Sequence, residues 1–135
     1  AGAADANAHI QSTVAFCPQT KLVLGGISQG AGVMDLITVG SRPIWFFTPS
    51  PLPAVVSDHV AAIAVFGNPS RDYSLLGPLT TLSPQYGSRS IDLCADGDPI
   101  CSKGLNFLAH LTYEWNGMVD EAATFAARRV LGQVA

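Results

Sequence analysis

The sequence predicts a three-layer α/β/α sandwich with a central parallel sheet, formed by residues 1–135 as a single domain. Segments of strand length occur at residues 22–24, 60–66 and 90–93, and the first two are wholly apolar. Segments with helical spacing precede, separate and follow them, and strands that alternate with helices favour a parallel sheet covered on both faces. A chain of 135 residues has room for one such domain and its core.

The chain begins with a predicted helix over residues 1–16, in which apolar residues recur at helical intervals: Ala3, Ala6, Ile10 and Val14. Cys17 and Pro18 end this helix, because proline disfavours helical geometry in the residue before it. The strand at residues 22–24 is apolar at every position, so we expect it to be buried on both faces. A second helix follows, again with apolar residues at helical spacing: Val33, Met34 and Ile37.

Residues 40–53 interrupt the helical pattern with prolines and aromatic side chains, and they predict a long loop of unusual apolar content. The aromatic residues of this loop are Trp45, Phe46 and Phe47. Two interpretations fit them equally well: the rings pack on the core, or they line a substrate-binding pocket for acyl chains. The sequence does not choose between these two.

The second half of the chain continues the alternation of strands and helices. The strand at residues 60–66 ends at Gly67, and residues 68–88 are rich in Gly, Ser and Pro and predict a loop. The strand at 90–93 leads into a loop with two cysteines, and residues 105–113 then predict a short helical turn that carries His110. End signals mark the last helix: Asn116 as its cap, Asp120 and Glu121 early, Arg128 and Arg129 late, and Gly132 beyond it.

Composition excludes several classes of function. The net charge of −3 provides no basic surface for nucleic acid or an anionic membrane. The longest apolar run, residues 60–66, is far shorter than the roughly 18 residues of a membrane span. The Ala-rich start of this chain has no signal-peptide features. Hydrophobic residues make up 48% of the chain, which is typical of a globular protein.

The cysteines indicate an oxidising compartment. Cys94 and Cys101 flank a turn-rich segment that can bring their Cα atoms within disulfide reach. A metal site is the competing interpretation, but there is no nearby histidine with ligand spacing, so we expect a disulfide and no metal. Such a disulfide favours a secreted or cell-envelope location. Cys17 is then left without a partner.

The chemistry of the chain centres on the pentapeptide Gly-Ile-Ser-Gln-Gly at residues 26–30. It lies between a predicted strand and a predicted helix, as a nucleophile elbow requires. We expect a turn so sharp that a Cβ atom at either Gly26 or Gly30 would clash, with Ser28 at its tip. The amides at the start of the helix then point to where negative charge would develop on a substrate oxygen.

A serine hydroxyl needs a base to remove its proton, and histidine is the usual base at neutral pH. His9 lies far upstream, and His59 precedes its strand and so lies at the opposite edge of the sheet. His110 follows the third strand, where loops return to the edge that carries Ser28. The chain order serine, aspartate, histidine that is expected of α/β-hydrolases favours His110 as the base.

An acidic side chain must orient the imidazole, and the loop after the third strand offers Asp96 and Asp98. Asp92 within the strand and Asp35 within the second helix are worse placed. A disulfide between the flanking cysteines would stiffen the loop that bears the acid. Spacing alone does not choose between Asp96 and Asp98.

Together these motifs resemble the cutinase family, and most closely its secreted serine esterases of actinobacteria. The likeness covers about residues 10–132 and rests on several matching segments: Cys17-Pro18, residues 26–30, residues 65–69, Gly97-Asp98-Pro99-Ile100-Cys101, His110 with Tyr113, and residues 122–127. The resemblance implies an α/β-hydrolase-like fold without a large lid. It also implies that Asp98 is the acid and that the Gln29 backbone amide is one oxyanion donor.

The same resemblance implies a serine esterase that acts on short to medium acyl or lipid-like esters and needs no cofactor. Two alternatives stay open: removal of acetyl groups from a polysaccharide such as xylan, and a remnant that is catalytically inactive. The apolar stretch at Trp45, Phe46 and Phe47 leans weakly toward acyl chains.

This sequence departs from the family pattern at its start. Family members carry upstream strands, with a second oxyanion residue and a cysteine that pairs with the one matching Cys17. We therefore expect an N-terminally truncated form of the fold. Leu22, Val23 and Leu24 would then pair with a separate N-terminal segment or promote self-association.

Overall fold

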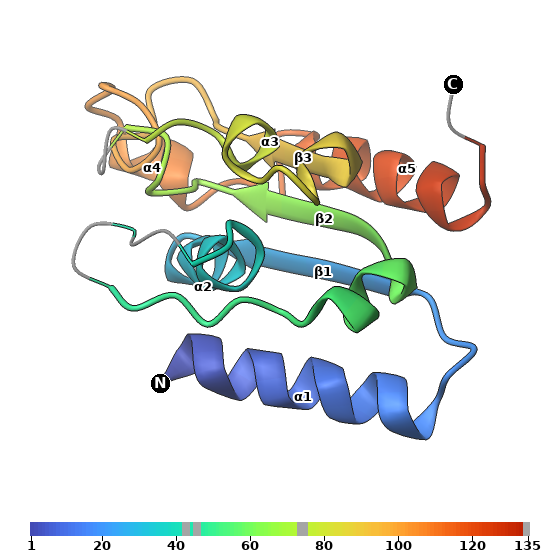
Figure 1. Ribbon diagram of the computed structural model, residues 1–135. Helices are drawn as coiled ribbons and strands as arrows, with labels where there is room; N and C mark the ends of the chain where they lie inside the picture. The colour runs from blue at the N-terminus through green and yellow to red at the C-terminus, as the bar shows by residue number, and fades with distance from the viewer. Residues whose placement is uncertain (42–43, 45–46, 73–75, 134–135) are drawn as a thin grey trace.

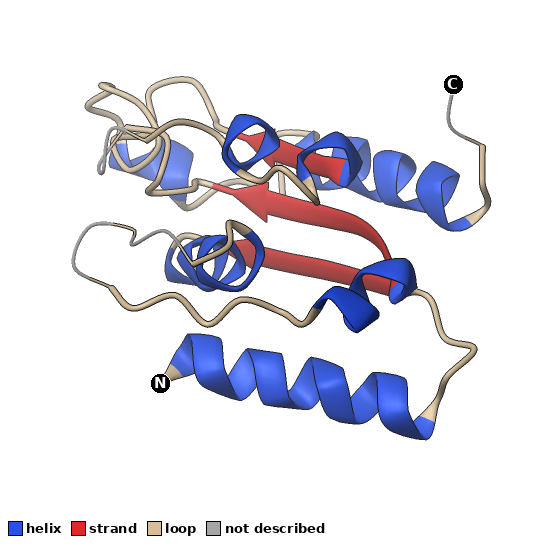
Figure 2. Cartoon of the chain, viewed as in Figure 1, coloured by secondary structure: helices blue, strands red, loops and turns tan. Residues whose placement is uncertain are grey.

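The computed structural model describes residues 1–41, 44, 47–72 and 76–133. The strands are β1 Leu22–Ile27, β2 Val60–Phe66 and β3 Ser90–Leu93. The helices are α1 Gly2–Phe16, α2 Gln29–Thr38, α3 Leu79–Leu82, α4 Phe107–His110 and α5 Met118–Val130, with short 3-10 turns η1 Ala54–His59 and η2 Gly87–Arg89. Figure 1 shows their arrangement and Figure 2 their types.

The strands form a parallel sheet in the order β1-β2-β3. β1 is longer than the sequence predicted and continues through two glycines to Ile27. Gly25 pairs with Ala64 and Ile27 with Phe66, so the ladder to β2 holds this segment extended. The prediction that the strand ends at Leu24 is therefore wrong, because glycines that favour a turn locally are here fixed by a neighbouring strand.

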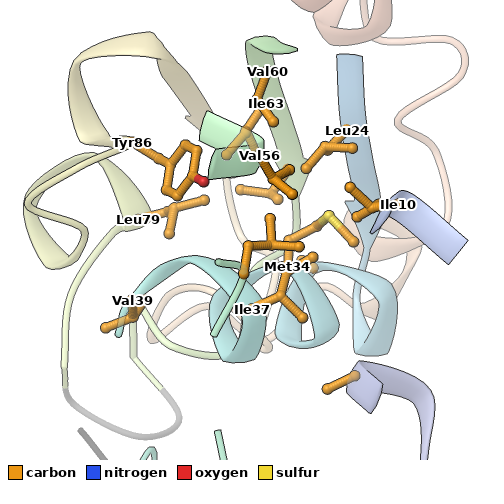
Figure 3. Close-up of a cluster of buried hydrophobic side chains, with 14 of the residues drawn as sticks. Ile10, Leu24, Met34, Ile37, Val39, Val56, Val60, Ile63, Leu79 and Tyr86 are labelled. Carbon is orange, nitrogen blue, oxygen red and sulfur yellow. The ribbon is translucent and has the colours of Figure 1, made fainter. Parts of the chain in front are cut away.

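Helices cover both faces of the sheet, which gives the predicted three-layer α/β/α sandwich. Ile63 and Val65 of β2 belong to the main hydrophobic cluster, to which α1 and α2 contribute. Figure 3 shows Leu24, Ile37 and Ile63 gathered in this cluster. Phe66 belongs instead to a second cluster, with Met118 of α5. Because successive strand residues face opposite sides, α5 lies on the face opposite to α1 and α2.

The α5 side of β1 is left uncovered. Val23 is 47% exposed and Ile27 is 48% exposed, while Leu24 on the other face is buried. α5 packs against β2 and β3, and no strand among the described residues pairs with the outer edge of β1. The expectation that this strand is buried on both faces is therefore wrong, because its second covering layer does not reach it.

Smaller differences from prediction occur in the loops and at one helix end. The predicted loop at residues 68–88 contains α3 and η2, and the predicted helical turn around His110 is confined to α4. The residue that caps α5 is Gly117 with φ 87°, rather than Asn116. The Asn116 side chain still accepts the N–H of Met118 at 3.0 Å. None of the described helices has the length and apolar character of a membrane span.

The parallel direction of the strands determines where polar side chains meet. The carboxyl ends of all the strands lie at one edge, so Ser28, Gly67 and the loop after Leu93 emerge together. His59 lies at the other end of the sheet, where its Nδ1 atom is 3.4 Å from the carbonyl oxygen of Thr20.

Candidate active site

Ser28 occupies the turn between β1 and α2 in a strained backbone conformation. Its φ is 57° and its ψ is −116°, and it is the only residue other than glycine with a positive φ in the described part of the chain. Such strain costs on the order of 1–3 kcal/mol and is typical of functional turns. Hydrogen bonds hold the turn: the Ser28 N–H donates to Phe66 at 2.9 Å, and its carbonyl accepts from Gly32 at 3.1 Å.

Only at one of the two glycines of the pentapeptide would a side chain clash with the backbone. A Cβ atom on Gly26 would lie 2.2 Å from the carbonyl oxygen of Gly30, so the helix start passes directly over Gly26. A Cβ atom on Gly30 would meet nothing within 4 Å. The expectation of a clash at both positions is therefore wrong for Gly30, because its backbone and not its substituent faces the strand.

Three side chains from distant parts of the sequence meet at this edge of the sheet. The Nε2 atom of His110 lies 2.9 Å from the Ser28 hydroxyl oxygen. The Nδ1 atom of His110 lies 2.7 Å from Oδ2 of Asp98. The carboxylate requires a proton on Nδ1, so Nε2 accepts the Ser28 hydroxyl proton. In this arrangement an imidazole can act as a base toward a serine.

Asp98 is completely buried, and hydrogen bonds keep it charged. Its Oδ2 atom accepts from the Tyr113 hydroxyl at 2.6 Å as well as from His110, and its Oδ1 atom accepts the Ile100 N–H at 2.8 Å. Burial alone would raise the pKa of Asp98, but the bonds from Tyr113, His110 and Ile100 outweigh it and lower this pKa. A buried carboxylate of this kind can stabilise a positive charge on the imidazole.

A disulfide between Cys94 and Cys101 closes the loop that carries Asp98, as the sequence predicted. Within this loop the Asp98 N–H donates to the carbonyl of Ala95 at 3.0 Å, which turns the Asp98 side chain inward. Asp96 is exposed on the same loop. The Asp98 carboxylate lies close to the sulfur atoms of Cys94 and Cys101. These two sulfur atoms are bonded to each other in the disulfide, so they cannot ligate a metal ion.

Gly67, directly after the end of β2, lies close against the imidazole ring of His110. Its φ is +57°, and a Cβ atom there would lie 2.8 Å from Cε1 of His110 and 3.2 Å from Oδ2 of Asp98. Its N–H donates to the carbonyl of Leu93 at 3.0 Å, which fixes the turn relative to β3. Only glycine combines this conformation with this close approach.

Comparison with known proteins identifies the family of the chain. The family description Cutinase matches residues 1–130. The chain is 50% identical over 133 residues to carboxylesterase Culp1 of Mycobacterium tuberculosis, which covers 96% of this chain and 56% of Culp1. The chain belongs to the cutinase family. It is also 50% identical over 129 residues to phospholipase Culp4 of the same organism, covering 96% of this chain and 55% of Culp4.

The cutinase-family chain thus spans a little over half the length of these relatives. Its fold is also similar to the catalytic core domain of acetyl xylan esterase from Trichoderma reesei, with a TM-score of 0.76 and 26% identity. That superposition covers 95% of this chain and 69% of the other.

Other predicted site residues of this cutinase-family chain have less definite surroundings. Gln29 is the first residue of α2, so its N–H has no carbonyl four residues earlier within the helix. Phe47 is 51% exposed, and its N–H donates to Ile44 at 3.0 Å. Trp45 and Phe46 lie outside the described residues. The two interpretations of the aromatic stretch therefore both stay predictions.

The segment around His110 exposes an unusual amount of apolar side chain. Each of the following residues is at least 65% exposed: Leu105, Phe107, Leu108, Leu111 and Trp115. They lie on α4 and directly before and after it, and α4 ends at His110. Apolar side chains gathered in this way are typical of surfaces that bind apolar ligands or partners.

A buried polar network extends from α2, the helix that follows the Ser28 turn, to β3. Asn68, fully buried, donates to Oδ1 of Asp35 at 2.9 Å and to Oδ2 of Asp92 at 3.0 Å. Asp92 also accepts from Arg71 at 3.3 Å and from the N–H of Leu79 at 2.8 Å. The network therefore joins α2, the turn after β2 and β3. Burial, with the nearby Asp92 charge, raises the pKa of Asp35 from 3.8 to about 7 despite the Asn68 hydrogen bond.

Sequence reasoning missed three features of this site. The sequence marks Tyr113 only as part of a motif, Gly67 only as the end of a strand, and Asp35 only as a poorly placed acid. The φ of Gly67 and the burial of Asp35 depend on contacts across the sheet, for which the local sequence has no signal. The close sequence spacing of His110 and Tyr113 was the one available clue.

Proposed function

We propose that this chain is a serine esterase of the cutinase family in which Ser28 is the nucleophile, His110 the general base and Asp98 the orienting acid. The observation that carries the proposal is the continuous hydrogen-bonded path from the Ser28 hydroxyl through both nitrogens of His110 to buried Asp98. The strained φ of Ser28 supports it, because strain persists only where the surrounding structure imposes it.

The proposed reaction has two halves. As Oγ of Ser28 attacks the ester carbonyl carbon, its proton moves to Nε2 of His110, and the carbonyl oxygen becomes an oxyanion. The intermediate collapses when the bond to the alcohol oxygen breaks, and His110 returns the proton to that oxygen. Water then attacks the acyl-enzyme in the same way, and the carboxylic acid leaves as Ser28 regains its proton. Asp98 stays ionised throughout and stabilises the imidazolium.

The Gln29 N–H is the proposed oxyanion donor within this chain. It follows the nucleophile directly and begins α2, so both its direction and the helix dipole favour negative charge at that point. A second donor is expected on a segment that would pair with the unpaired edge of β1. Exposed Val23 and Ile27 support such a covering segment, and Cys17, which is exposed and free, would form a disulfide with it.

The proposed substrates are esters with short to medium acyl chains or lipid-like esters. The exposed apolar residues that flank His110 in sequence support this class, because exposed apolar surface near the base favours an acyl chain over water. The relative Culp4, named a phospholipase, is consistent with it. The disulfide in the acid loop supports a secreted or envelope location.

Deacetylation of a polysaccharide such as xylan is the second candidate. It is favoured by the structural similarity to an acetyl xylan esterase core. The two candidates are separated by comparing kcat/KM for p-nitrophenyl acetate, butyrate and octanoate with the rate of acetate release from acetylated xylan. A higher kcat/KM on octanoate than on acetate, without release from xylan, supports the lipid-like class, and the reverse pattern supports deacetylation.

The catalytic assignment is tested with p-nitrophenyl butyrate and a fluorophosphonate label. We expect Ser28→Ala and His110→Ala to lower kcat by at least about 10⁴-fold, and Asp98→Asn by roughly 10²–10⁴-fold. Asp96→Asn is the matched control, since Asp96 is exposed on the same loop, and it should retain full activity. The label should be found on the Ser28 peptide. Labelling elsewhere, or loss of activity in Asp96→Asn but not in Asp98→Asn, would contradict the assignment.

If the folded chain neither takes the label nor hydrolyses any of these esters, the alternative of an inactive remnant is correct. The same assays should therefore be run with a family-like N-terminal segment added. Gain of activity on addition would assign the deficit to an oxyanion donor carried by that segment rather than to the residues described above.

A further inference from the structure

Tyr113 is a buried residue whose hydroxyl contacts the Asp98 carboxylate. The side chain is 1% exposed, and its ring packs against Phe66 and lies edge-on to the ring of His110, with centroids 6.3 Å apart. The hydroxyl accepts the N–H of Ala95 at 3.0 Å and donates to Oδ2 of Asp98 at 2.6 Å. Because the phenolic oxygen already accepts a hydrogen bond from the Ala95 N–H, the hydroxyl donates its own hydrogen bond to Asp98.

We propose that Tyr113 is a positioning residue that sets the basicity of the Asp98–His110 pair by sharing Oδ2 with the imidazole. Nδ1 of His110 lies 2.7 Å from this same oxygen. A carboxylate oxygen that accepts two hydrogen bonds offers less negative charge to each donor than one that accepts a single bond. The bond from Tyr113 therefore weakens the hold of Asp98 on a protonated imidazole.

The same hydroxyl also fixes the orientation of the carboxylate. Rotation of the Asp98 side chain would break the bonds from Tyr113 and His110 to Oδ2 and the bond from Ile100 to Oδ1. Tyr113 links the carboxylate to Ala95, so the acid loop and the segment after α4 move as one unit. The imidazole then stays directed at Ser28.

The charged groups around this cluster are few among the described residues. Asp98 accepts directly from the Tyr113 hydroxyl, the His110 ring lies edge-on to the Tyr113 ring, and Arg71 acts on Tyr113 at longer range. Burial first, and then the bond to Asp98, raise the pKa of Tyr113, so its hydroxyl stays protonated and remains a donor at every working pH. Cys101 lies 3.5 Å from the hydroxyl, but its sulfur is in the disulfide and does not titrate.

The chain contains a matched control for this proposal. Tyr86 is also buried, at 2% exposure, but its hydroxyl has no hydrogen-bond partner among the described residues. Tyr86→Phe thus removes a buried phenolic oxygen without removing a hydrogen bond, whereas Tyr113→Phe removes the same atom together with its bonds to Ala95 and Asp98. Comparison of the two variants isolates those bonds.

The test follows the His110 imidazole by NMR titration and the esterase by its pH profile. In Tyr113→Phe, we expect the midpoint of the His110 titration and the acid limb of kcat/KM to move upward by about 0.5–1 pH unit. We expect kcat to fall roughly tenfold, as for loss of a hydrogen bond to a charged group, with KM unchanged. Tyr86→Phe should match the unmodified chain in every measurement.

A second variant keeps the test decisive if Tyr113→Phe folds poorly, since it leaves the Ala95 N–H without an acceptor. Site-specific 3,5-difluorotyrosine at position 113 retains both bonds but is a stronger donor, so the titration should move downward. A merely structural role predicts no movement in either direction. If the His110 titrations of Tyr113→Phe and Tyr86→Phe coincide, or the fluorinated chain does not shift, the proposal is wrong.

The inference rests on the proposed function only for its effect on turnover, because the NMR titration needs no substrate. A chain that titrates as expected but hydrolyses no ester would contradict the proposed function and support the positioning role. An active chain in which the His110 titration does not change on substitution of Tyr113 would support the proposed function and contradict the positioning role.

Discussion

Replacement of Asp35 by asparagine should make the protein more stable at neutral and alkaline pH. Asp35 is 1% exposed, and burial raises its pKa from 3.8 to about 7, with the Asp92 charge adding to the effect. A carboxyl whose pKa is raised by folding stabilises the native state below its ordinary pKa. This stabilisation is lost as the pH rises through the folded-state pKa. Asparagine mimics the protonated carboxyl: its amide oxygen can still accept from Asn68, and it carries no charge for burial to penalise.

The size of the effect follows from the displacement of the pKa. A shift from 3.8 to about 7 corresponds to roughly 4 kcal/mol, since each unit is worth about 1.4 kcal/mol. The free energy of unfolding of Asp35→Asn minus that of the unmodified chain should therefore grow by up to about 4 kcal/mol between pH 4 and pH 9. Most of the change should fall between about pH 4 and pH 7, that is, between the ordinary pKa of the carboxyl and its folded-state pKa.

Urea denaturation followed by circular dichroism, at intervals of pH, measures this difference directly. Other titrating groups affect both proteins and cancel in the subtraction. Asp96→Asn is the control, because this aspartate is exposed and its replacement should give a difference that does not change with pH. A constant difference for Asp35→Asn as well would show that the pKa of Asp35 is the same in the folded and unfolded states, and would refute the argument from burial.

Three further predictions concern the loop, the elbow and the sheet edge. The Cys94–Cys101 disulfide contributes about 2–3 kcal/mol of stability by loop closure. Its reduction with dithiothreitol should lower esterase activity before the circular dichroism signal of the fold is lost. Loss of activity and of the circular dichroism signal at the same dithiothreitol concentration would contradict this. Gly67→Ala should lower kcat roughly a hundredfold by displacing the imidazole, whereas Gly30→Ala should keep activity and gain about 0.5–1 kcal/mol of stability. Adding a family-like N-terminal segment should raise kcat about a hundredfold or more and abolish self-association detected by gel filtration. If the chain without this segment is already monomeric and has the same kcat as the extended chain, the segment is dispensable.

Local signals in the sequence were sufficient for most of the elements. An apolar run marked β2, and the spacing of Ala3 and Ile10 marked the buried face of α1. Where prediction failed, the deciding contacts were distant in sequence. Gly25 is extended because β2 pairs with it, and Val23 is exposed because α5 does not extend over β1.

The candidate site divides in the same way. Chain order and strand direction were enough to bring Ser28 and His110 to one edge of the sheet. They did not choose between Asp96 and Asp98, which required the family resemblance, because both lie on one short loop and differ only in which way they turn. Burial of Asp98 depends on Tyr113, and the local sequence does not reveal a hydrogen bond between them.

The 82 residues that separate Ser28 from His110 also make the site a marker of complete folding. Its two sides are brought together by the pairings of β1 with β2 and β2 with β3, both of which are non-local and form slowly. α5 and the disulfide loop can form from local contacts while Ser28 and His110 are still apart. Recovery of the hydrogen bond between them during refolding therefore reports the assembled sheet, which recovery of helix content does not.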